Sequence, residues 1–236
     1  MRIYPALGNH EFYDRDFLPR QQRALQNWWT AFPFLKELRW YSVQLGAHLY
    51  ALCLDSNFGA LREGTPQWSW LDQQLSHLPE SIKYVFFVLH HAPIGDYLEG
   101  HSRDQHAPST ATGLQGYVER KQAHSGARFI VVSGHIHNYA RCERNGVVYI
   151  VSGDGGAHPV FFRRQPDDKF KGKDLTVDGQ ALPNYHYVRF ELSSDSLKAA
   201  MVRISNPRTG SGHAKWDTPD EFVITPRNEF TPAAGR

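Results

Sequence analysis

Several histidines of this chain stand directly after apolar runs that are typical of β-strands. The three segments are 8–11 (Gly-Asn-His-Glu), 89–93 (Leu-His-His-Ala-Pro) and 133–137 (Ser-Gly-His-Ile-His). Ligands of α/β proteins gather beyond the carboxyl ends of strands, so these segments would converge at one sheet edge if their strands are neighbours. Imidazole nitrogens combined with an oxygen donor suit Zn, Fe, Ni or Mn(II). The sequence therefore predicts a metal site with asparagine and histidine ligands.

The spacing of His135 and His137 adds to this prediction. Residues two apart do not share a face of a helix, but they can converge in an extended segment or a loop. Gly134 lets the backbone approach a bound group closely. Taken alone, the pair is weak evidence, because histidine pairs arise by chance in a chain with 13 histidines. The combination of three segments carries the prediction.

Apolar periodicity predicts the elements that would position these segments. The expected strands are 2–7, 40–45, 48–54, 83–89, 128–133, 147–152, 185–192 and 197–204, the expected helices are 20–32, 66–78 and 114–124, and 91–113 is expected to be a long loop. Thr65 and Pro66 are typical of an N-cap and a first-turn proline. Helices between buried strands indicate a layered α/β fold in one domain.

Composition excludes several classes of protein. The chain has 236 residues, of which 41% are hydrophobic and 21% charged, as in ordinary soluble globular proteins. A net charge of +2 without a clustered basic face gives no indication of nucleic-acid binding. No apolar run approaches the roughly 18 residues of a membrane-spanning helix. Cys53 and Cys142 are expected to be unpaired thiols, because a disulfide framework needs more cysteines.

Together, the three motifs in this order resemble the calcineurin-like metallophosphoesterases, and within them the purple-acid-phosphatase-like branch. Trp70 and Leu71 ahead of the middle motif, the continuation of the last motif through 138–141 (Asn-Tyr-Ala-Arg), and 152–156 (Ser-Gly-Asp-Gly-Gly) fit as well. The resemblance implies an α/β metallophosphoesterase sandwich, with helices flanking mixed β-sheets and without the first strands of the family fold. It would cover 1–205 as the C-terminal part of the family domain, followed by a loosely held tail over 206–236.

The resemblance also implies roles for individual residues. Asn9 would bind one metal through its side-chain oxygen, and His135 would complete the same site. His137 would bind the second metal. His10 would face the substrate phosphate as the catalytic hydrogen-bond or proton donor.

The middle metal ligand is either His90 or His91. Counting from the end of the strand favours His90, which we prefer, whereas a His-x-Pro pattern favours His91. The other histidine would then lie behind the ligand or on the substrate side.

Three further residues are candidates for phosphate contacts. The resemblance suggests that a loop histidine after the middle motif, His101 or His106, contacts the substrate phosphate; the alternative is a solvated loop histidine. Arg141 would contact phosphate as a planar cation. The alternative for Arg141 is a structural salt bridge.

The family's carboxylate ligands are missing from this chain. An Asp-x-His on the first strand and a Gly-Asp segment after the second would precede Asn9, and Asp14, Asp55 and Asp96 stand in the wrong context to replace them. His137 would be nearly the sole ligand of its metal. We expect reduced metal affinity, and we interpret the chain either as part of a longer protein whose start lies upstream or as a remnant.

The resemblance implies a hydrolase that acts on phosphate esters through a metal-bound hydroxide, with Fe, Zn or Mn in a dinuclear centre. Without the bridging carboxylate, we expect weak or absent activity in this chain. The alternatives are a non-catalytic phosphoesterase-like binding module and a structural protein with one zinc ion. The partner would be a phosphate-ester substrate of open identity, and the family leans toward secreted or periplasmic proteins.

Overall fold

A computed structural model of the chain describes residues 2–12, 19–94, 107–156, 172–174, 185–193, 196–205 and 215–227. The helices are α1 (Pro19–Ala31), α2 (Pro66–Ser76) and α3 (Ala107–Ala123), with short 3-10 helices at Asn9–Glu11, Pro33–Leu35 and Asn57–Gly59. The strands are β1 (Tyr41–Gln44), β2 (Leu49–Cys53), β3 (Tyr84–Leu89), β4 (Arg128–Ser133), β5 (Tyr139–Arg144), β6 (Val147–Ser152), β7 (Gly172–Asp174), β8 (His186–Leu192), β9 (Leu197–Ser205) and β10 (Lys215–Ile224).

These strands form two sheets. The larger sheet has seven strands in the order β1-β2-β3-β4-β6-β5-β7, and the smaller has the order β10-β9-β8. Neighbours among β2, β3, β4 and β6 are parallel, whereas β1, β5 and β7 pair antiparallel with theirs. The parallel strands therefore present their carboxyl ends at one edge, which is the arrangement that the histidine segments require.

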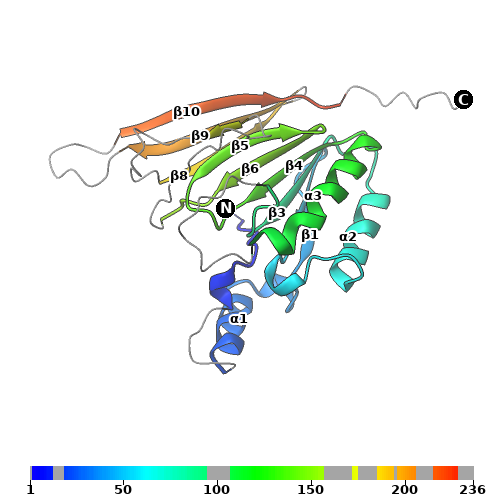
Figure 1. Ribbon diagram of the computed structural model, residues 1–236, viewed down its shortest axis with the longest axis vertical. Coiled ribbons are helices and arrows are strands. Elements are labelled where there is room, and N and C mark those ends of the chain that lie inside the picture. The colour runs from blue at the N-terminus through cyan, green and yellow to red at the C-terminus, as the bar shows by residue number, and fades with distance from the viewer. Residues whose placement is uncertain are drawn as a thin grey trace, which may run out of the picture.

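The larger sheet is buried on both faces. On β3, Val85 and Phe87 belong to the core that includes residues of α2 and α3, whereas Tyr84 and Phe86 belong to the core shared with β9 and β10. Successive side chains of a strand point to opposite faces, so the continuous apolar run of β3 fills both cores. Figure 1 shows the resulting layers: α2 and α3 on one side of the sheet, and β8, β9 and β10 on the other.

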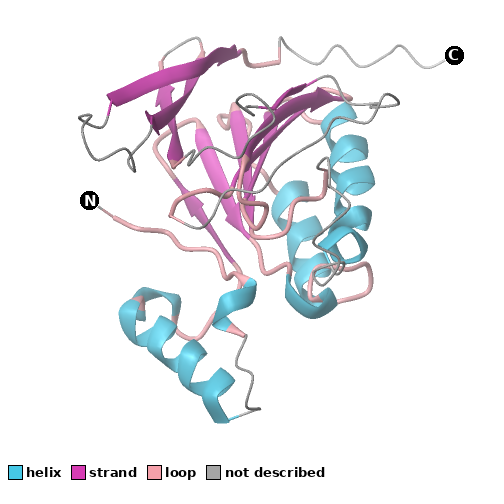
Figure 2. Cartoon of the chain, turned by 60° about the vertical axis from the view of Figure 1, so that its left-hand side comes forward, coloured by secondary structure: helices cyan, strands magenta, loops and turns pink. Residues whose placement is uncertain are grey.

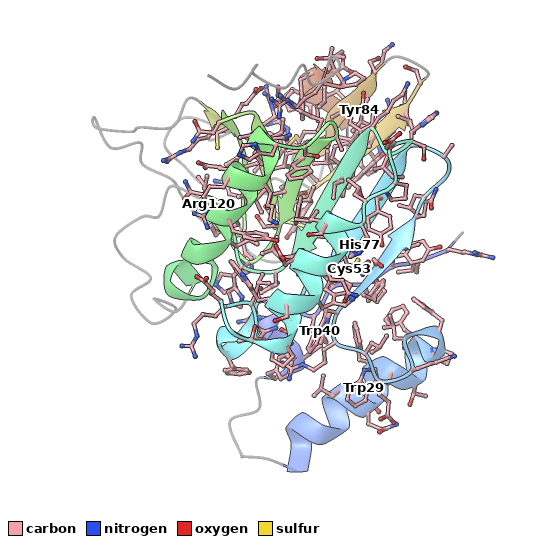
Figure 3. All side chains as sticks on the ribbon, turned by 90° about the vertical axis from the view of Figure 1, so that its right-hand side faces the viewer. Trp29, Trp40, Cys53, His77, Tyr84 and Arg120 are labelled. Carbon is pink, nitrogen blue, oxygen red and sulfur yellow. The ribbon has the colours of Figure 1, made fainter. Side chains whose placement is uncertain are left out.

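Helix α1 lies outside these layers, as Figure 2 shows. Trp28, Trp29 and Phe32 pack against a small cluster of Leu35, Tyr41 and Cys53. Trp29 and Cys53 are labelled in Figure 3. Cys53 and Cys142 are both buried and are not joined in a disulfide, as the composition indicated.

The sequence identified most of the elements correctly. The α/β sandwich with flanking helices is confirmed, and so is the N-cap of α2, where the Thr65 hydroxyl accepts a hydrogen bond from the Trp68 N–H at 3.3 Å. No helix in the described part of the chain is long and apolar enough to cross a membrane.

Four expectations need correction. Residues 2–7 form no strand, and α3 begins at Ala107 rather than at 114. Strand β5 was not expected. The prediction of a loose tail from 206 is wrong for 215–224, which form β10 and pair with β9 over 215–217 and 220–224, with a register shift between Asp217 and Asp220. Ile224 of β10 is buried in the core between the sheets, and this burial holds the strand.

Candidate metal centre

Two neighbouring parallel strands bring the histidine segments together. β3 ends at Leu89 and β4 at Ser133, and these two residues are register partners. The Gly134 N–H donates to the His90 carbonyl oxygen at 3.0 Å, so the two segments stay paired just beyond the strands. The third segment, the 3-10 helix Asn9–Glu11, begins after Gly8, whose N–H donates to a Glu11 carboxylate oxygen at 2.7 Å.

The donor atoms of three predicted ligands meet at one point. His90 Nε2 lies 2.6 Å from Asn9 Oδ1 and 3.0 Å from His135 Nδ1. A neutral imidazole nitrogen carries either a hydrogen or a lone pair. His90 Nε2 can therefore donate to Asn9 Oδ1 or accept a hydrogen from His135 Nδ1, but it cannot do both. Such crowding of lone pairs is what a cation would relieve.

His91 completes the group. The ligand atoms of His90, His91 and His135 all lie within 4.8 Å of one another, and the His91 and His135 ring centroids are 4.6 Å apart. His91 is buried, and its Nδ1 lies 2.9 Å from the Ser56 hydroxyl oxygen. Both residues of the 90–91 pair therefore reach the cluster.

The electrostatics of the cluster favour a neutral His90. Burial, and after it the nearby His135, His91, His10 and His137, lower the pKa of His90 to about 3. His90 is therefore neutral at neutral pH, which is the form that binds metal. The same influence shows that His10 and His137 lie within electrostatic reach of His90.

Tight backbone geometry holds His135 in place. His135 has φ +64°, in the left-handed region that costs energy for a residue other than glycine. A Cβ on Gly153 would stand 2.0 Å from the carbonyl oxygen of Ile136. The 152–156 turn therefore supports the loop that carries His135, a structural role that the sequence did not reveal.

Gly8 makes a similar close approach. A Cβ there would stand 3.0 Å from His90 Nδ1. The glycine thus lets the segment that carries Asn9 approach the His90 ring.

The remaining candidates lie in different surroundings. His10 is exposed, and His137 is half-buried in the connection from β4 to β5. Arg141 donates two hydrogen bonds to Asp220, from Nε to Oδ2 at 2.8 Å and from Nη2 to Oδ1 at 3.1 Å. This ion pair is the structural salt bridge that was the alternative to a phosphate contact for Arg141. His101 and His106 lie outside the described residues.

Sequence reasoning missed one contributor, the turn after β2. Asp55, Ser56 and Asn57 are buried, and Ser56 contacts His91. The available signal was the one used for the histidines, namely polar residues directly after an apolar strand. Asp55 forms an ion pair with Arg39.

The donor set fits one metal ion better than two. Imidazole nitrogens and an amide oxygen suit Zn and other borderline cations. Tetrahedral ligands about 2.1 Å from zinc stand about 3.4 Å apart, so small movements from the 2.6 and 3.0 Å contacts would make room. In the described part of the chain, the metal-competent group contains histidines and no carboxylate. The second metal would rely on His137.

Comparison with known proteins agrees with this geometry. No protein-family model matches the chain. It is 28% identical to a phosphoenolpyruvate phosphatase of Allium cepa over 123 residues, 51% of this chain and 23% of that protein. It is 27% identical to a nucleotide pyrophosphatase/phosphodiesterase of Hordeum vulgare, over 50% of this chain and 36% of that protein. Purple acid phosphatase 1 of Ipomoea batatas is also 27% identical, over 50% of this chain and 27% of that protein.

Solved structures share the fold. Purple acid phosphatase PPD1 from yellow lupin superposes with a TM-score of 0.58 and 17% identity, over 80% of this chain and 33% of that one. A Plasmodium structure described as GAP50, the anchor in the inner membrane complex, gives 0.53 and 16%, over 82% of this chain and 56% of that one. The chain has the calcineurin-like metallophosphoesterase fold. Its resemblance to purple acid phosphatases is confirmed, although it spans only about a quarter to a third of the curated relatives.

Proposed function

We propose that this chain binds one metal ion at the cluster of Asn9, His90, His91 and His135, and that it hydrolyses phosphate esters slowly when the metal is bound. The convergence of Asn9 Oδ1, His90 Nε2 and His135 Nδ1 within hydrogen-bonding distance supports the proposal most directly. The phosphatase and phosphodiesterase names of the curated relatives support the substrate class.

Each residue of the cluster has a stated part in this proposal. Asn9 and His135 are ligands, and the 90–91 pair supplies the third. His90 Nε2 lies between the other two donors, which supports the preference for His90. The His91 Nδ1 atom lies against the Ser56 hydroxyl oxygen, and a metal-ligating histidine usually has an oxygen acceptor for its other ring N–H, which supports His91. Single substitutions of His90 and His91 decide between them.

The reaction would use the metal and the exposed His10. A bound metal ion polarises a phosphoryl oxygen and lowers the pKa of water toward neutrality. His10 follows Asn9 in the same 3-10 helix and is open to solvent, which supports its proposed role as the group that donates a hydrogen bond or a proton to the substrate. His137, the predicted ligand of the second metal, would strengthen the positive field at the phosphate.

The expected rate is low for an electrostatic reason. Dinuclear phosphoesterases clamp the attacking and the leaving oxygens between two metals. The ligands of the cluster are neutral, and neutral ligands do not offset the charge of two divalent cations. Only one metal ion therefore remains to act on the reacting oxygens. Iron, zinc and manganese are the candidates that the donor atoms and the family suggest.

A binding module without catalysis is the second candidate. The carboxylate-free metal group favours it, since weak metal affinity removes the chemistry while leaving the fold intact. The fold also occurs in the Plasmodium protein described as an anchor.

Metal loading with an activity assay tests the proposal. The purified chain is stripped with a chelator and titrated with Zn, Mn or Fe, and hydrolysis of a chromogenic phosphomonoester and a diester is followed. One metal per chain with slow turnover, both lost in His135→Ala but kept in His124→Ala, is the expected result. His124 is an exposed histidine after α3, near the opposite end of β4, and provides the matched control. One metal without turnover would favour the binding module, and no metal would contradict the proposal.

A further inference from the structure

A buried polar turn lies directly beside the histidine cluster. Asp55, Ser56 and Asn57 follow β2 and are at most 2% exposed. Since β2 and β3 are parallel, with Cys53 and Val88 as partners, the turn runs alongside the residues that follow β3. Buried polar groups are retained when they are hydrogen-bonded, so the partners of this turn indicate what it does.

Ser56 makes two contacts with His91. Its hydroxyl oxygen accepts the His91 backbone N–H at 3.0 Å and lies 2.9 Å from the His91 ring nitrogen Nδ1. One hydroxyl group thus fixes both the backbone and the ring of His91. Because Nδ1 is directed at Ser56, Nε2 is the ring nitrogen that remains for the cluster.

The chemistry of the two groups is compatible with metal binding at Nε2. A serine oxygen has two lone pairs, so it can accept the His91 backbone N–H and an Nδ1–H together. In that arrangement Nε2 carries a lone pair. Histidine ligands of metals usually donate their other ring N–H in this way, and loss of the partner weakens metal binding about 10- to 100-fold.

Ser56 is itself held rigidly. The Gln67 side chain clamps the Asp55 backbone, accepting its N–H and donating to its carbonyl oxygen, both at 2.8 Å. Asp55 Oδ1 accepts from the backbone N–H of Asn57 at 2.9 Å and from its side-chain amide at 2.8 Å. Arg39 pairs with the other carboxylate oxygen. These contacts fix the turn on both sides of Ser56.

The turn also reaches the segment that carries Asn9. The Asn57 side-chain amide donates to the Leu7 carbonyl oxygen at 3.4 Å, and Leu7 is fully buried two residues before Asn9. One polar turn therefore contacts the segment 89–93 and the residue that directly precedes the segment 8–11.

We propose that Ser56 is a positioning residue for metal binding, which acts through His91 by holding its ring with Nε2 toward Asn9, His90 and His135. The proposal rests on the proposed metal site, with His91 as one of its ligands. It adds a residue outside the three histidine motifs, in a turn to which the sequence assigned no role.

A double-mutant cycle on zinc affinity tests this proposal. Zinc affinity is measured by competition with a chromophoric chelator for the wild type, Ser56→Ala, His91→Ala and the double variant. We expect Ser56→Ala to weaken binding about 10-fold or more. We expect the double variant to bind like His91→Ala alone, because the hydroxyl has nothing to position without the ring. The absorption of bound Co(II) should report a changed ligand geometry in Ser56→Ala.

Matched variants distinguish a positioning role of Ser56 in zinc binding from a general effect of the substitution on stability. Ser69→Ala removes an exposed hydroxyl on α2 and should leave zinc affinity unchanged. Ser56→Thr, which keeps a hydroxyl acceptor, should bind zinc more tightly than Ser56→Ala, and Ser56→Gly replaces Ser56→Ala in the cycle if that variant does not fold. Wild-type affinity in Ser56→Ala, or full additivity in the cycle, would overturn the role of Ser56 while leaving the metal site in place. Absence of zinc binding by the wild type would overturn both.

Discussion

The histidine cluster and the charged group formed by Tyr139, Arg141 and Asp220 share the stretch of chain 135–141, yet their polar groups are satisfied in opposite ways. In the charged group, the Asp220 carboxylate accepts hydrogen bonds from the Tyr139 hydroxyl and from two nitrogens of Arg141. In the cluster, neutral donor atoms crowd around His90 Nε2. A network with matched charges stabilises the fold, whereas a crowded neutral one is suited to a ligand.

The two groups also differ in what they connect. Asp220 belongs to β10 and the other two residues to β5, so the charged group joins the two sheets. Arg141 additionally stacks on Phe222 at 4.0 Å from the ring centroid. Burial, followed by the hydrogen bond to Asp220, raises the pKa of Tyr139, which keeps its hydroxyl protonated as a donor. The cluster instead joins loops at the edge of a single sheet.

Breaking the charged group should have the largest effect on stability. Asp220→Ala leaves the partly buried Arg141 charge and the Tyr139 hydroxyl without their acceptor, so we expect a loss of about 3 to 5 kcal/mol in the free energy of unfolding. Denaturant titration measures it. Asp217→Ala on the same strand is the control, because its pair with Arg203 is exposed on the Asp217 side and should contribute under about 1 kcal/mol. Equal losses of unfolding free energy in Asp220→Ala and Asp217→Ala would show that the buried charged group stabilises the fold no more than an exposed ion pair does.

Gly153→Ala should damage both regions. The new Cβ would meet the Ile136 carbonyl oxygen, so the loop between His135 and Tyr139 must move. We expect a loss of about 3 kcal/mol from overpacking, together with impaired zinc binding. Gly155→Ala, where a Cβ meets nothing within 4 Å, is the matched control. Intact zinc binding in Gly153→Ala would show that the turn does not support the site.

His135→Ala should separate function from stability. Removal of a ligand is expected to weaken zinc affinity about 100-fold, which is about 2.7 kcal/mol of binding. The free energy of unfolding of the metal-free variant should lie within about 1 kcal/mol of the wild-type value, because removal of the ring relieves the crowding. Isothermal calorimetry and denaturant titration provide the two numbers. A large loss of unfolding free energy in the metal-free variant would show that the cluster stabilises the fold, as the charged group does.

Tyr139→Phe should have the smallest effect of the four. It removes one hydrogen bond to Asp220 and leaves the Arg141 pair in place, so we expect about 1.5 kcal/mol of destabilisation. Thermal unfolding of the variant and of Tyr139→Phe/Asp220→Asn would show whether the two residues are coupled. Independent, additive losses would contradict the hydrogen-bonded group.

The strongest sequence signals were those that combined local pattern with burial. The apolar run 83–89 predicted β3, and Thr65 with Pro66 predicted the start of α2. Residues 2–7 looked like a strand, but a strand needs a hydrogen-bonded neighbour, and the sheets of the described chain offer it none. β10 was missed because its Pro219 and acidic residues resemble a loop, whereas pairing with β9 decides its structure.

The residues of the candidate site likewise divide into those that the sequence predicted and those that it did not. The strand-end rule brought His90 and His135 together correctly, because parallel neighbours share an edge. Asn9 also reaches the cluster, although the strand expected over 2–7 does not form and the rule therefore does not explain its position. Ser56 was not recognised, because serine after a strand has no distinctive spacing and its role depends on contact with a residue 35 positions away. The pairing of Arg141 with Asp220 likewise depends on the position of β10.

Zinc stoichiometry measures the central claim most directly. Chelator-stripped wild-type chain, titrated with zinc in a calorimeter and then analysed for metal content after gel filtration, should retain one zinc ion per chain. The Asp220→Asn variant, if folded, should retain one as well, and His135→Ala none. Absence of zinc in the wild type, or retention of two ions with rapid phosphate-ester hydrolysis, would contradict a single carboxylate-free site at the ends of β3 and β4.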